Sequence, residues 1–124
     1  MTRAATLAGA CLLLLGLAGP ASAAVIAYRA DLSGANEDVP NASPATGFAL
    51  VTIDTVAHTM RIQLTFAGLE GDSIGAHIHC CTAVPLSGVA GVATQTPAFA
   101  GFPLGDVTGA MDTTFDMTQA ASFN

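Results

Sequence analysis

The sequence contains no lysine and no tryptophan, and its only tyrosine is Tyr28. Arginine is nearly as rare, since only Arg3, Arg29 and Arg61 are present. With nine acidic residues, the 124-residue chain has a formal charge of −6. Surfaces that bind nucleic acid or anionic membranes need clustered basic side chains to meet the phosphates. The composition therefore argues against both kinds of partner, and the scarcity of Trp and Tyr leaves no obvious aromatic platform for sugars.

Long apolar runs are also absent, with one exception near the N-terminus. Arg3 precedes a leucine-rich run over residues 7–18, and Ala21-Ser22-Ala23 gives the small-x-small pattern of a cleavage site. The run is shorter than the roughly 20 residues that a membrane-spanning helix needs. We therefore expect residues 1–23 to be a signal peptide, cleaved before Ala24, and the exported chain to carry no membrane anchor.

Residues 24–124 are then one domain of modest size. The loss of Arg3 takes the formal charge from −6 to −7. The scattered acidic residues are typical of the solvated exterior of a soluble secreted protein. Export places the domain in a periplasmic or extracellular space, and the organism is expected to be bacterial.

The clearest secondary-structure pattern lies in residues 47–66. Met60, Ile62, Leu64 and Phe66 alternate with polar residues, as they should in a half-exposed antiparallel strand. Residues 48–53 carry apolar side chains in both alternating sets, which suits a strand that is covered on both faces or lies near the centre of a sandwich. Residues 54–59 are the natural hairpin connection between these two strands. We therefore expect His58 to lie in a solvated turn, away from the other two histidines.

Other parts of the chain also favour short strands and loops. Strands are predicted at 25–31, 89–94 and 109–115, loops at 33–44 and 98–106, and the beginning of a short helix at 116–120. No stretch beyond residue 23 has a convincing 3.6-residue apolar period. The pattern predicts an all-β protein, an antiparallel β-sandwich.

Most of the side chains suited to metal or redox chemistry fall in one stretch, Ala76-His77-Ile78-His79-Cys80-Cys81. In an extended strand, alternate side chains share a face, so His77, His79 and Cys81 would lie together. Two imidazoles and a thiolate are a ligand set that suits copper or zinc. The alternative is that both histidines make ordinary hydrogen bonds or face solvent.

Cys80 and Cys81 allow three interpretations in an oxidising compartment. They can form a disulfide with each other at a turn, Cys81 can bind a metal as a thiolate, or both can remain free or pair with another molecule. The turn-forming residues after Cys81 favour the disulfide, and the metal ligands would then be His77 and His79 alone.

Several motifs in order resemble the CHRD domain, a module first described in chordin and also found alone in secreted microbial proteins. They are Leu32-Ser33-Gly34-Ala35-Asn36-Glu37, Ala42-Ser43-Pro44-Ala45-Thr46-Gly47, Leu64-Thr65-Phe66-Ala67-Gly68-Leu69, Ala76-His77-Ile78-His79 and Thr114-Phe115-Asp116-Met117-Thr118. The resemblance covers nearly all of residues 24–124. It implies an immunoglobulin-like antiparallel β-sandwich.

The resemblance also implies an incomplete domain, because CHRD domains normally continue past the Thr-Phe-Asp segment into a helix and closing strands. The sandwich is therefore expected to lack its C-terminal strands. The family has no firmly assigned enzymatic activity, so the resemblance implies a secreted, non-enzymatic domain, which we interpret as a binding or structural module. Because the composition offers neither a sugar platform nor a nucleic-acid surface, we expect its partner to be a protein or one that the sequence does not identify. The alternative function is that of a copper or zinc binding protein.

Overall fold

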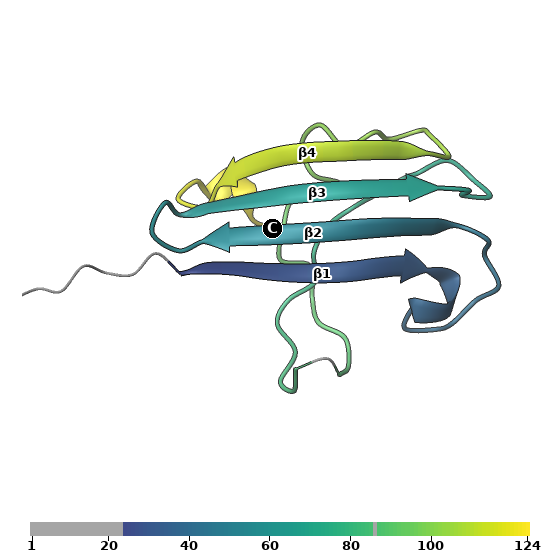
Figure 1. Ribbon diagram of the computed structural model, residues 1–124, viewed down its shortest axis with the longest axis horizontal. Helices are drawn as coiled ribbons and strands as arrows, with labels where there is room; N and C mark the ends of the chain where they lie inside the picture. Colours follow the sequence, from purple (N-terminus) through teal and green to yellow (C-terminus); the bar gives the residue numbers. More distant parts are fainter. Residues whose placement is uncertain (1–23, 86) are drawn as a thin grey trace, which may run out of the picture.

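The computed structural model describes residues 24–85 and 87–124, and the predicted signal peptide, residues 1–23, lies outside them. The described residues form one four-stranded antiparallel sheet in the order β1-β2-β3-β4, with almost no helix (Figure 1). The elements are β1 (Val25–Ser33), the 3₁₀ turn η1 (Gly34–Asn36), β2 (Thr46–Asp54), β3 (Thr59–Ala67), β4 (Gly109–Asp116) and the 3₁₀ turn η2 (Ala120–Ser122). The all-β prediction is confirmed.

The β2–β3 hairpin follows directly from local chemistry. The Asp54 carboxylate accepts the backbone N–H groups of Ala57 and Val56 at 2.8 and 2.9 Å, which fixes the turn. These two bonds favour the charged carboxylate and lower the pKa of Asp54. His58 takes a left-handed conformation with φ of 52°, so the chain can reverse into β3. The predicted hairpin is confirmed, with His58 exposed in its turn.

The register of the sheet separates an apolar face from a polar one. Ile53, Met60 and Phe115 are aligned across β2, β3 and β4, and Val51 and Ile62 are aligned one pair further along. We call this face the inner face. It supplies most of the core, a cluster of Met60, Ile62, Phe99, Met111 and Phe115.

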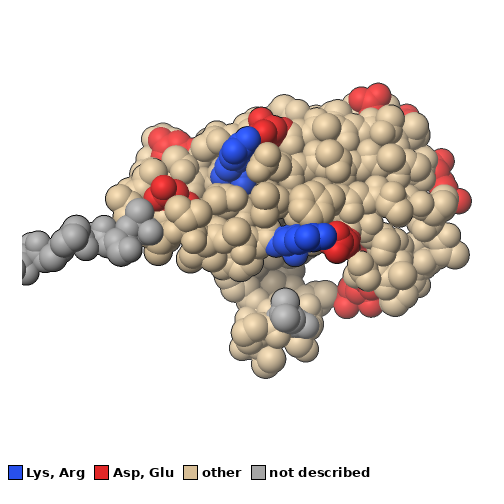
Figure 2. Space-filling model, in the orientation of Figure 1, with Lys and Arg blue, Asp and Glu red and all other residues tan. Residues whose placement is uncertain are grey.

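The opposite, outer face carries the ion pairs (Figure 2). The guanidinium of Arg61 donates to both carboxylate oxygens of Asp112 on the neighbouring strand, at 2.7 and 2.6 Å. Arg29 lies 3.3 Å from Asp31 and stacks over the ring of Phe48, 5.1 Å from its centroid. The charged ends of the two arginines stay in water while their stems cover apolar surface, so the outer face is solvated.

Residues 68–85 and 87–108 form an irregular layer that lies against the inner face. Phe99, 6% exposed, joins the core from this layer, and the buried hydroxyl of Ser73 donates to the carbonyl of Pro103 at 2.7 Å. The predicted strand at 89–94 is wrong, because only isolated bridges form there, at Val92 and Thr94. Pro85, Pro97 and Pro103 remove backbone donors and interrupt regular pairing. The second sheet of a sandwich therefore stays a prediction.

Two other boundaries differ from those expected. The first strand, predicted to end at residue 31, continues to Ser33. The predicted helix at 116–120 is wrong: the Asp116 carboxylate accepts the N–H and hydroxyl of Thr118, and this local bonding produces a turn followed by η2.

Candidate functional site

The His-x-His stretch is extended, but it is not a regular strand. Its backbone is held by N–H bonds from Ala76 to the Pro97 carbonyl (3.1 Å), from Ile78 to the Thr94 hydroxyl (2.8 Å) and from Cys80 to the Gly91 carbonyl (3.1 Å). The N–H of Ile78 bonds to a side-chain hydroxyl and not to a backbone carbonyl, which interrupts the ladder. The predicted strand is therefore reduced to two isolated bridges, at Ala76 and His79. The alternation of side chains survives, with Ala76 and Ile78 packed against the core.

The rings of His77 and His79 lie side by side, with centroids 4.9 Å apart. The Nδ1 atom of His77 is 3.2 Å from the carbonyl oxygen of Pro97, and that of His79 is 2.7 Å from the carbonyl oxygen of Ala90. A carbonyl can only accept, so each Nδ1 carries the proton and, in the neutral ring, each Nε2 has a free lone pair. This is the arrangement that commonly orients histidine ligands toward a metal.

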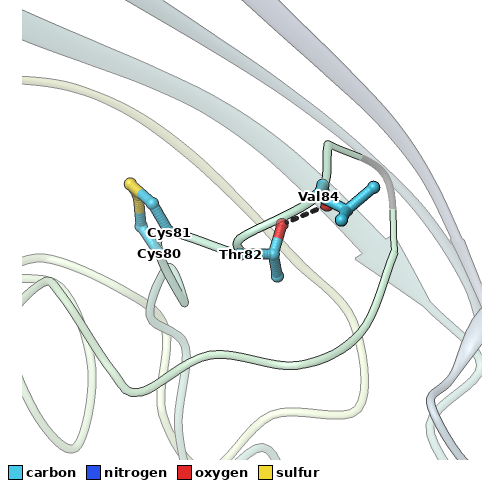
Figure 3. The surroundings of a disulfide bond; sticks show 4 residues. All are labelled: Cys80, Cys81, Thr82 and Val84. Atoms are coloured by element: carbon cyan, nitrogen blue, oxygen red, sulfur yellow. Dashed lines mark hydrogen bonds between the residues drawn. A yellow bond between two sulfur atoms is a disulfide. The ribbon is translucent and has the colours of Figure 1, made fainter.

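The sulfur atoms of Cys80 and Cys81 are bonded to each other, and both residues are exposed (Figure 3). The turn that follows is held by the hydroxyl of Thr82, which donates to the carbonyl of Val84 at 2.9 Å. While the disulfide is closed, the sulfur of Cys81 is not a thiolate.

The structure brings His77 and His79 together and places His58 elsewhere, in the β2–β3 turn. Across residues 24–85 and 87–124, no group of three or more His, Cys, Asp or Glu side chains is placed to hold a metal ion. An ion bound here would therefore take two ligands from the protein, and the rest from water or a partner.

Both histidines contribute to the lining of a groove of about 740 Å³. Its floor is the inner face of β1 and β2. Ala30 and Ala49 are paired there, and their small side chains make the groove deeper at this point. One wall is the loop that includes Ser33 and Asn41, and the other is the irregular layer with Phe99 and Phe102. This layer covers the inner face of β3 and β4, whereas the inner face of β1 is open.

The groove was not predicted from the sequence, although its parts were. The turn-rich residues 33–44 indicated a surface loop, but no local pattern placed that loop beside the His-x-His stretch. The carbonyls of Ala90 and Pro97, which hold the histidine rings, come from residues 11 and 20 positions further along the chain. Such partners carry no side-chain signal in the sequence.

Among the residues that the structure describes, no helix is long and apolar enough to span a membrane. Searches of curated proteins and of solved structures found no match. The family model of the CHRD domain, in contrast, matches residues 28–123. The matched range begins in β1, includes His77 and His79, and ends after η2. The match covers most of the sequence, and the chain belongs to the CHRD domain family.

Proposed function

We propose that this CHRD domain is a non-enzymatic binding module of the extracellular space or cell envelope, and that it binds a protein partner through the open part of its inner face. One observation carries the proposal. The inner-face side chains of β1 are apolar but remain exposed, with Ile26 at 41%, Tyr28 at 55% and Leu32 at 39%. CHRD domains occur in extracellular proteins, which supports the predicted export.

The chemistry of the groove favours an extended apolar segment as the bound group. Its floor is apolar where β1 and β2 meet, and its volume lies within the range of ordinary ligand sites. The edge of β1 runs alongside and can offer backbone hydrogen bonds to an added strand. Apolar side chains of the bound segment would then enter the groove beside Leu32 and Val51.

Nile red, an uncharged dye that fluoresces in apolar surroundings, tests the groove. The full chain is expressed with its own N-terminal segment, recovered after export and titrated with the dye. We expect saturable binding that Ala49→Arg abolishes, because the new side chain fills the floor. Thr65→Arg is the matched control, since Thr65 lies on the outer face of β3, and it should bind as wild type does.

Equal dye binding by Ala49→Arg and wild type would refute the groove as the binding surface. If Ala49→Arg fails to fold, Ala30→Asp in the exposed strand β1 serves instead. The same preparation tests export: we expect protein outside the cytoplasm that begins at Ala24. Uncleaved protein retained in the cytoplasm would contradict the extracellular assignment.

A second candidate function is supported by the hydrogen bonds of the two histidines. We propose that Nε2 of His77 and Nε2 of His79 bind one copper or zinc ion. Two imidazoles bound at about 2.0–2.1 Å to a tetrahedral ion would have ring centroids roughly 5 Å apart. The observed 4.9 Å between the ring centroids is compatible with this geometry.

Copper and zinc titrations followed by calorimetry test this second candidate. We expect about one bound ion per chain, with binding lost in the His77→Ala/His79→Ala variant. His58→Ala removes a histidine from the distant turn and should leave binding unchanged. Absence of binding by folded wild type, or equal binding by the double variant, would show that the two histidines serve only the structure.

A further inference from the structure

Among the residues that the structure describes, β1 is an edge strand of the sheet, and one row of its backbone groups has no strand partner. β1 pairs with β2 over all nine of its residues. Just before it, the carbonyl of Ala24 accepts the N–H of Thr55, so it points toward β2. Because backbone groups alternate in direction along a strand, Val25, Ala27 and Arg29 present theirs to the open edge. The carbonyl of Asp31, next in this row, accepts the Asn36 side chain.

This edge lacks most devices that prevent pairing with another chain. Exposed edge strands are usually short, or carry proline, lysine or a bulge. β1 is nine residues long, its sequence VIAYRADLS contains neither proline nor lysine, and its register with β2 is unbroken. Its charged residues, Arg29 and Asp31, have opposite signs and lie on the same, outer face.

We propose that β1 pairs antiparallel with β1 of a second copy of this chain, centred on Ala30, so that the two sheets join into one of eight strands. The inference rests on the proposed function and names the protein partner of that surface.

Charge selects the register. With Ala30 at the centre, Arg29 of each copy lies directly opposite Asp31 of the other, which gives two cross-strand ion pairs. Centring the pair on Arg29 would place two guanidinium groups opposite each other. Centring it on Tyr28 would place both charges opposite apolar residues, Ala27 and Val25. Arg29 and Asp31 of one copy already lie 3.3 Å apart, and only the register centred on Ala30 adds pairs of opposite charge between the two strands.

The inner face fits the same register. Tyr28 of each copy then lies opposite Leu32 of the other, so exposed apolar side chains cover one another. The loop segments 80–85 and 87–91 pass behind the sheet and extend beyond β1 (Figure 1). They carry Val84 and Val89, both exposed. In the dimer these segments would lie on the side of the second copy's inner face, where apolar surface is open.

Sedimentation equilibrium of the exported full chain at micromolar to submillimolar concentrations tests the proposal. We expect wild type to dimerise, and Arg29→Asp or Asp31→Arg alone to weaken the dimer roughly tenfold or more, because each puts like charges opposite. The exchange Arg29→Asp/Asp31→Arg should restore dimerisation. An equimolar mixture of the two single variants should also associate, because every cross-strand pair is then of opposite sign.

A wild type that remains monomeric throughout this range would overturn the proposal, as would single variants that dimerise as well as wild type. Arg29 and Asp31 are exposed, so their variants should fold, which circular dichroism checks. Saturable Nile red binding by a monomeric wild type would refute the second copy as partner and leave the proposed groove standing. Failure of the dye experiment together with an intact dimer would reject the groove alone.

Discussion

The ring of Phe99, in the irregular layer, packs against the ring of Phe115 in β4, with centroids 5.7 Å apart. The ring of Phe102 stacks on the ring of Phe66 in β3, with centroids 5.4 Å apart. These two contacts join a segment without regular secondary structure to the inner face of the sheet. They hold the layer over β3 and β4 and leave the inner face of β1 open.

Replacing Phe99 by alanine should therefore destabilise the whole domain. Removal of a buried phenylalanine costs about 3–5 kcal/mol, from lost burial and the cavity left behind. Urea unfolding monitored by circular dichroism measures the loss. Val89→Ala, at an exposed position of the same layer, should stay within about 0.5 kcal/mol of wild type. A Phe99→Ala variant as stable as wild type would mean that the layer does not pack on the sheet.

Gly109→Ala should also be destabilising, because there is no room for a methyl group at the start of β4. A Cβ atom there would lie 2.6 Å from Cγ of Pro103 and 2.8 Å from Cε1 of Phe66. Overpacking of this kind costs about 1–3 kcal/mol. Gly71→Ala is the control, because no atom lies within 4 Å of its added carbon. Equal unfolding midpoints for the two variants would contradict the packing around β4.

The Arg61–Asp112 pair should make stability depend on pH. The hydrogen bonds from Arg61 lower the pKa of Asp112 below its ordinary value. A carboxyl group with a lowered folded-state pKa stabilises the protein above its unfolded pKa, about 3.9, and this contribution is lost as the pH falls through the folded value. The free energy of unfolding of wild type should exceed that of Asp112→Asn by the full amount at pH 7, and this difference should shrink below about pH 4.

Urea midpoints of both proteins between pH 7 and pH 2.5 would measure this difference. When Arg61 is already replaced by Gln, the further substitution Asp112→Asn should change the urea midpoint at pH 7 much less than it does in wild type. A difference that is the same at every pH, or that survives without Arg61, would show that the ion pair does not cause it.

Reduction should strengthen metal binding if the second candidate function holds. Opening the Cys80–Cys81 disulfide frees the sulfur of Cys81, which follows His79 by two residues. A thiolate would then add a third, soft ligand for zinc or copper. Zinc titration with and without a phosphine reductant measures the change, and Cys81→Ser should abolish it. Equal affinity in both redox states would restrict the ligands to the two histidines.

The regular part of the fold could be predicted because its signal is local. The alternation of Met60, Ile62 and Leu64 identifies β3 and its buried face, and Asp54 marks the turn before it. The irregular layer could not be predicted, because its alanine, glycine and proline residues have no period and its order depends on distant partners. The N–H of Ile78, for example, is satisfied by the hydroxyl of Thr94.

The candidate site was predictable only in part. The proximity of His77 and His79 follows from their spacing along an extended chain. The carbonyl groups of Pro97 and Ala90, which fix both rings, come from elsewhere in the layer. The exposure of the inner face of β1 could not be predicted either, because apolar residues such as Ile26 and Leu32 give the same sequence pattern in a covered strand.

Amide hydrogen exchange along β1, measured by NMR in dilute protein, tests most directly the claim that β1 is an open edge available for binding. We expect the amides of Ala27 and Arg29 to exchange with little protection, those of Ile26 and Tyr28 to be protected by β2, and the first pair to become protected as the concentration rises. Protection of Ala27 and Arg29 equal to that of β3 at every dilution would mean that the edge is already closed, and would contradict the account.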